Sequence, residues 1–69
     1  MKTSMLKSLR KKYEAEMESA MCNIEVYMES PVGIGEHPDL VESVESQVTR
    51  WMEAEEMIAA LDKIMEKVG

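Results

Sequence analysis

Apolar residues recur at intervals of three and four along the first part of the chain, which is the spacing that places side chains on one face of an α-helix. The series is Leu6, Leu9, Tyr13, Met17, Ala20, Ile24 and Tyr27. Pro31 disfavours helical geometry at the residue that precedes it, so this helix should end before Ser30. The pattern therefore predicts a helix over residues 3–29.

A second series with the same spacing follows later in the chain. Its members are Val41, Val44, Val48, Trp51, Ile58, Leu61, Met65 and Val68, with Ala54 or Glu55 in the one gap. Pro38 suits the first position of a helix, where its missing N–H costs nothing. Asp39 and Glu42 place negative charge at the positive end of the helix dipole. These features predict a helix over residues 38–67.

Two long helices joined by the short segment 30–37 are expected to fold back as an antiparallel hairpin. The charges agree with this orientation, because the basic residues of segment 1–12 would then lie beside the acidic residues of segment 53–66. The chain is therefore predicted to be all-α, with residues 1–69 forming a single helical-hairpin domain.

Self-association is expected because the hairpin has more apolar surface than one seam can cover. A chain of 69 residues buries a modest core. Cys22 is the only cysteine, so a disulfide framework is excluded. The simplest solution is a homodimer or higher oligomer in which two hairpins form a four-helix bundle. The expected interface residues are Met17, Met21, Val44, Val48, Trp51 and Ile58.

The net charge of −6 is unevenly distributed along the hairpin. Between Tyr13 and Thr49 there is no lysine or arginine, whereas Lys2 to Lys12 hold five basic residues. The end of the hairpin opposite the loop, which we call the open end, is therefore basic. The acidic loop end of one hairpin would be attracted to the open end of another. Charge alone favours a head-to-tail pair, by about 1 kcal/mol after screening.

The segment between the helices contains the residues that typically form turns. We assign Pro31, Gly33, Ile34, Gly35, His37 and Pro38 to this loop. A phosphate-binding loop would need further glycines or a lysine after a strand, and none is present. The segment is therefore expected to be a bend that connects the two helices.

No catalytic, cofactor or metal site is expected. One cysteine and one histidine cannot supply the ligands of a zinc site. A di-iron bundle needs Glu-x-x-His motifs, which the sequence lacks. A chain of this size, without a nucleophile paired to a base, is not expected to be an enzyme.

The stretch SPVGIGEHPDLVESVESQV, followed by AEEMIAALDKI, resembles very small proteins of tailed phages that infect marine bacteria and cyanobacteria. The resemblance covers about residues 30–65 and consists mainly of the PVGIGEHPD-type loop. It implies a phage source, and with it the cytoplasm of the host cell. It supplies no catalytic residues.

The expected function is that of a small acidic interaction module or regulator that binds itself and an unidentified protein. The acidic charge opposes binding to nucleic acid or to a membrane. The sequence lacks the continuous apolar stretch that a secretory signal or a membrane span requires, so an intracellular location is expected. The alternative is an acidic inhibitor that mimics nucleic acid and occupies the basic groove of a host nucleic-acid-binding protein.

Overall fold

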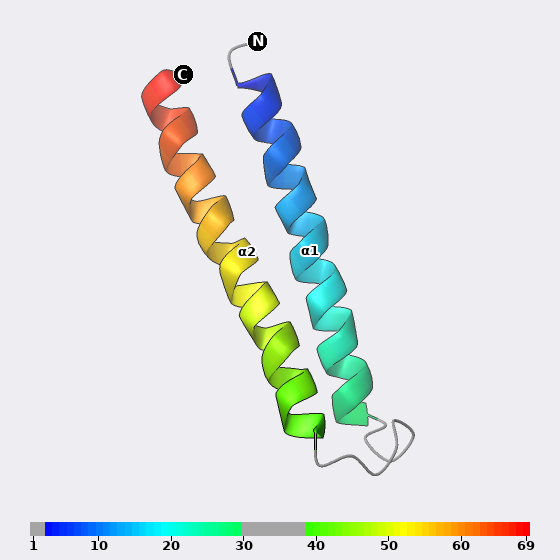
Figure 1. Ribbon diagram of the computed structural model, residues 1–69. Helices are drawn as coiled ribbons and strands as arrows, with labels where there is room; N and C mark the ends of the chain where they lie inside the picture. The colour runs from blue at the N-terminus through cyan, green and yellow to red at the C-terminus, as the bar shows by residue number, and fades with distance from the viewer. Residues whose placement is uncertain (1–2, 30–38) are drawn as a thin grey trace.

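The computed structural model describes residues 3–29 and 39–69, and these form two long helices. Helix α1 comprises Ser4–Glu29 and helix α2 comprises Leu40–Val68. They lie side by side and antiparallel, so that the beginning of α1 and the end of α2 are at one end of the molecule (Figure 1). The predicted all-α hairpin is confirmed. The loop residues predicted from the sequence lie outside the described residues.

The ends of the helices are defined by backbone hydrogen bonds. The Lys7 N–H donates to the carbonyl of Thr3 over 2.8 Å, and the Ser43 N–H donates to that of Asp39 over 2.9 Å. At the other end of α2 the Gly69 N–H donates to the Met65 carbonyl over 2.8 Å. A Cβ at position 69 would lie 2.8 Å from that same oxygen. Glycine is therefore the residue that best closes α2.

The core between the helices is thin. Among the described residues only Ala20, Ala54 and Leu61 are buried. The two alanines allow the helix backbones to approach closely, since interhelical distance depends on the side chains at the contact. No large side chain in the described part of the chain is fully buried. The hairpin alone therefore removes little apolar surface from water.

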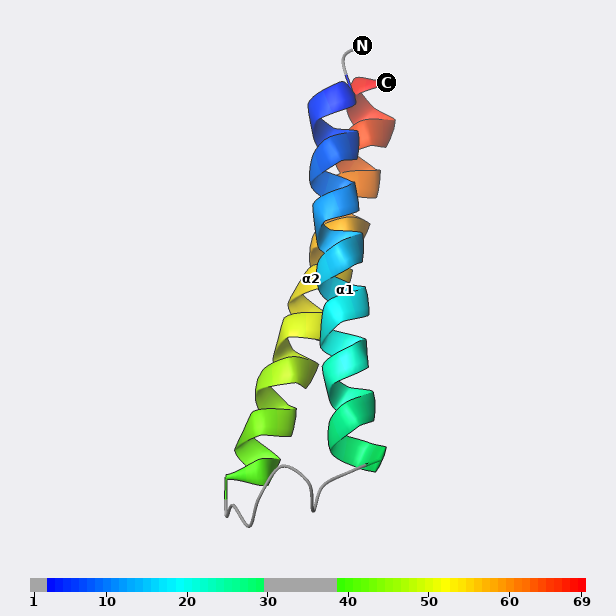
Figure 2. The ribbon, with the colours of Figure 1, turned by 90° about the vertical axis from the view of Figure 1, so that its right-hand side faces the viewer.

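The contact seam of the hairpin follows a seven-residue repeat. In α1 it contains Leu6, Tyr13, Ala20 and Tyr27, and in α2 it contains Leu40, Gln47, Ala54 and Leu61. These residues are buried or half-buried. A repeat of seven keeps one side of each helix against its neighbour as the two helices cross at a shallow angle (Figure 2).

The predicted apolar series of α2 and the observed seam differ near the loop. Val41 and Val48 belong to that series, and Val48 was expected at the dimer interface; in the hairpin they are 77% and 48% exposed. Leu40 is half-buried in their place. This difference arises at Gln47. It occupies a seam position, but a series built from apolar residues alone does not include it. Steps of seven from Ala54 lead through Gln47 to Leu40, so each valine lies one residue beyond the seam.

Neither helix is apolar enough over a sufficient length to span a membrane.

Candidate functional site

The hairpin has two broad sides, and cross-helix pairs show which residues share a side. Eighteen residues make five turns of an α-helix, so Arg10 lies on the same side of α1 as Met28, and Asp62 on the same side of α2 as Val44. The Arg10 Nε and Nη2 atoms donate to the Asp62 carboxylate over 2.7 and 3.1 Å. All four residues therefore lie on one side of the hairpin. We call this side the groove face.

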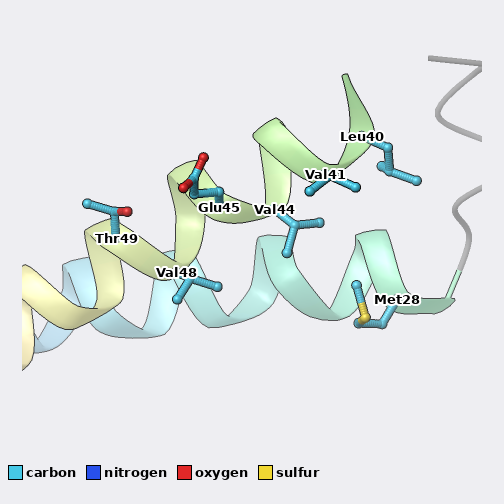
Figure 3. Close-up of a pocket in the computed structure, with 7 residues that line it drawn as sticks. All are labelled: Met28, Leu40, Val41, Val44, Glu45, Val48 and Thr49. Atoms are coloured by element: carbon cyan, nitrogen blue, oxygen red, sulfur yellow. The ribbon is translucent and has the colours of Figure 1, made fainter. Parts of the chain in front are cut away.

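An open apolar groove of about 540 Å³ lies at the loop end of the groove face. Its lining is mostly carbon, with Met28 contributed by α1 and the other residues by α2 (Figure 3). The lining residues are Met28, Leu40, Val41, Val44, Glu45, Val48 and Thr49. Met28 and Val41 are 61% and 77% exposed, so the groove is open to solvent. An apolar surface of this kind can bind another apolar surface.

The six predicted interface residues all lie on the groove face. Met21 precedes Met28 by seven residues, and Val48 lines the groove itself. Met21 and Val48 are 45% and 48% exposed. The other four flank the seam and are half-buried. Met17 and Val44 precede Met21 and Val48 by four residues, and Trp51 and Ile58 follow Val44 by seven and fourteen. The structure therefore brings together residues that the sequence had placed on separate helices.

The open end of the groove face is charged. Arg10 bonds Asp62 and also donates to Glu14 over 2.8 Å. The hydrogen bonds with Asp62 raise the pKa of the Arg10 guanidinium above its ordinary value. In return, the hydrogen bond from Arg10 lowers the pKa of the Asp62 carboxyl. The groove face thus changes from apolar at the loop to ionic near the termini.

The opposite face has a polar network at the level where the groove face is apolar. Arg50 Nε donates to Glu16 over 2.7 Å, and Asn23 Nδ2 donates to the Gln47 side chain over 3.0 Å. Arg50 Nη1 adds a contact of 3.3 Å to Gln47. The hydrogen bond from Arg50 lowers the pKa of Glu16, and the same bond raises that of Arg50.

The exposed apolar residues of the opposite face lie mainly near the open end. Leu9 precedes Glu16 by seven residues, and Met57 and Ile64 follow Arg50 by seven and fourteen. Their exposures are 37%, 36% and 44%. The groove face is therefore apolar at the loop end, whereas most exposed apolar residues of the opposite face lie near the open end.

Side chains of the kinds that ligate metal ions are spread along both helices. Within residues 3–29 and 39–69, no three His, Cys, Asp or Glu side chains are grouped so that they could hold a metal ion. Cys22 is free and exposed. Pro31, Gly33, Ile34, Gly35, His37 and Pro38 lie outside the described residues.

The groove itself was not predicted from the sequence. Met28 was expected to widen the apolar face of the first helix toward a second contact, and Leu40 to flank that of the second helix. Glu45 and Thr49 are polar residues outside any apolar series. The sequence feature that could have predicted the groove is the seven-residue repeat. It places Leu40 in the seam, so that Val41 and Val44 lie to one side of it.

The geometry defines an antiparallel helical hairpin with an apolar groove at the loop end of one face. Comparisons of this chain with protein-family models, with curated proteins and with solved structures gave no match.

Proposed function

We propose that this protein is a protein–protein interaction module that works as a homodimer, in which two hairpins join through their groove faces as a four-helix bundle. The observation that carries this proposal is the imbalance between its core and its surface. Among the described residues three are buried, whereas eleven large apolar side chains are exposed. Proteins that are stable as monomers rarely leave so much of their apolar surface uncovered.

Burial in a dimer would compensate for the thin core. Covering one large apolar side chain contributes roughly 1.5–3 kcal/mol. Met21, Met28, Val41 and Val48 are all exposed on the groove face. Their combined burial would outweigh the contribution of any surface ion pair in the molecule.

The groove face is the better interface because the opposite face is polar along its middle. Pairing through the opposite face would cover Glu16 and Arg50, whose side chains are 40% and 34% exposed. Removing these charges from water carries a desolvation cost that their mutual bond offsets only in part. Nearer the loop, the groove face carries Met21 and Val48 instead, and its nearest carboxylate on α2 beyond them is Glu55, seven residues after Val48.

The dimer would act as a binding partner for another protein and not as a catalyst. Leu9, Met57 and Ile64, the exposed apolar residues near the open end of the opposite face, stay uncovered in the proposed dimer and provide a surface for that partner. Methionine suits such a surface because its flexible side chain adapts to partners of different shape.

Analytical ultracentrifugation of a Val48→Glu variant tests the proposal. The wild-type chain should sediment at twice the 7.9 kDa chain mass at micromolar concentration. Val48→Glu should remain helical by circular dichroism but dissociate, because a carboxylate would enter the apolar interface.

Val26→Glu is the matched control. Val26 is 55% exposed on α1, three residues after Asn23 of the opposite face. This variant should remain dimeric. A monomeric wild-type chain, or equal dissociation of the two variants, would contradict the proposal.

A further inference from the structure

We infer that the groove face takes a second copy of this chain loop end to loop end, so that the two hairpins point in the same direction. The inference rests on the proposed dimer and adds its polarity. It differs from the head-to-tail arrangement that charge alone favours. Three observations carry it: the size of the face, the position of its apolar part, and the spacing of the exposed residues.

The size of the face requires the two copies to overlap along their whole length. The hairpin measures 50 × 14 × 13 Å. One side has a footprint of about 700 Å², close to the roughly 800 Å² that each partner buries in a stable interface. A staggered pair that joined only the apolar halves would cover about half of this area. Two fully overlapping arrangements remain, one loop to loop and one head to tail.

The position of the apolar part distinguishes these two arrangements. Head to tail, the groove at the loop end would cover the Arg10–Asp62 pair and Glu14 at the open end of the second copy. Apolar side chains would then desolvate three charged groups without offering them hydrogen bonds. Loop to loop, each groove covers the other groove, whose lining holds one charged side chain, Glu45. The charged open ends then meet each other as groups of mixed sign.

The spacing of the exposed residues makes the groove face complementary to itself. Met21 and Met28 are seven residues apart on α1, and Val41 and Val48 are seven residues apart on α2. Met28 and Val41 both line the groove, so the two pairs begin at the same level of the hairpin. A two-fold axis along the hairpin places α1 of one copy against α2 of the other. Each methionine then meets a valine of the second copy.

The loop-to-loop arrangement gathers acidic residues at one end of the dimer. Each copy contributes five carboxylates from the described residues nearest the loop, which are Glu25, Glu29, Asp39, Glu42 and Glu45. No lysine or arginine lies between Tyr13 and Thr49 to neutralise them. These groups are exposed, so salt screens their repulsion. Burial of the apolar groove outweighs the screened repulsion.

A distance between spin labels at the open end tests the polarity. Lys67 is exposed and lies 27 residues into α2, at about 40 Å from the loop end at 1.5 Å per residue. A Lys67→Cys variant in a Cys22→Ser background would carry the label. In the loop-to-loop dimer the two labels should be less than about 30 Å apart, whereas head to tail they would be more than about 40 Å apart.

Sedimentation of the same labelled sample shows whether a failed test concerns the polarity of the dimer or the existence of the dimer. A dimer with a long distance would overturn the polarity and leave the proposed function intact. A monomer would overturn both. A label at Ser19, close to half-way along the hairpin, is the matched control and should give a short distance in either arrangement.

The salt dependence of dimerisation gives a second, independent test. Raising NaCl from about 0.05 to about 0.5 M should lower the dimer dissociation constant several-fold, because screening relieves the repulsion between the loop ends. A Glu25→Gln/Glu45→Gln variant should lose most of this dependence. A dimer that weakens as salt is added would overturn the inference, since attraction between opposite ends predicts that sign.

Discussion

The groove face and the opposite face of this hairpin are built from the same two helices, yet apolar and charged residues are distributed differently along them. On the groove face the loop end is apolar and the open end carries the Arg10–Asp62 pair. On the opposite face Glu16 and Arg50 lie near the middle, and the exposed apolar residues lie toward the open end. Composition alone would not separate the two faces.

The difference shows that the function of an exposed apolar residue depends on what surrounds it. Val26 and Val48 have similar exposure, at 55% and 48%. Val48 belongs to a groove with six other residues, whereas Val26 is close to the polar Asn23–Gln47 pair. A contiguous patch can exclude water when a partner binds, but an isolated apolar residue among polar groups cannot.

The largest expected effect comes from the seam that both faces share. Leu61 is 3% exposed, so Leu61→Ala should lower the free energy of unfolding by about 3 kcal/mol. Ile64→Ala is the control on the same helix, at 44% exposure, and should cost less than about 1 kcal/mol. Urea denaturation at one fixed protein concentration measures both. Equal losses would show that the seam is not the core.

A smaller effect is expected at the boundary between the seam and the groove face. Trp51 is half-buried there, and Trp51→Ala should cost about 2 kcal/mol where the dimer is populated. The loss should decrease on dilution, because part of the tryptophan is covered by the second copy. Met52→Ala, at the neighbouring and 45% exposed position, should cost less at every concentration. Thermal melts over a dilution series measure this, and a loss independent of concentration would place Trp51 in the monomer seam alone.

The smallest effect concerns the charged end of the groove face. The ordinary pKa of Asp62 is 3.8, and its hydrogen bond from Arg10 lowers this pKa in the folded state. A lowered carboxyl pKa stabilises the folded state at pH values above 3.8, and the stabilisation is lost as the pH falls through the lowered value. Wild type should therefore melt slightly above Asp62→Asn at neutral pH.

That difference should disappear in strong acid, below the folded-state pKa of Asp62. The side chains of Arg10 and Asp62 are 33% and 50% exposed, so solvent screens their interaction and the effect is small. Glu16→Gln on the opposite face should behave in the same way, because the hydrogen bond from Arg50 lowers the pKa of Glu16. A melting difference that grew in acid would contradict this account.

The extent of both helices could be predicted from the sequence because helical periodicity is a local property. Residues three and four apart share a face whatever the rest of the chain does. The helix expected over residues 3–29 is Ser4–Glu29, and the one expected over residues 38–67 is Leu40–Val68. The hairpin followed from helix length and the short connection.

The seam of α2 near the loop could not be predicted in the same way. Val41 and Val48 are at least as apolar as Leu40 and Gln47, so hydrophobicity favoured the valines. The helices instead meet where small residues allow close approach, at Ala20 and Ala54. That contact sets the rotation of α2 and places Gln47 in the seam. The same rotation of the helices places the predicted interface residues on one face of the single hairpin.

The sequence by itself determined two amphipathic helices, their antiparallel pairing and an acidic loop end, because each depends on spacing, length or composition. The tertiary structure decided which exposed residues belong together. The Arg10–Asp62 and Glu16–Arg50 bonds lie on opposite sides of the seam and are consistent with a single rotation of each helix. With that rotation, Met28 of α1 and Val44 of α2 line one groove. No local pattern contains this relation, because it depends on two helices being placed against each other.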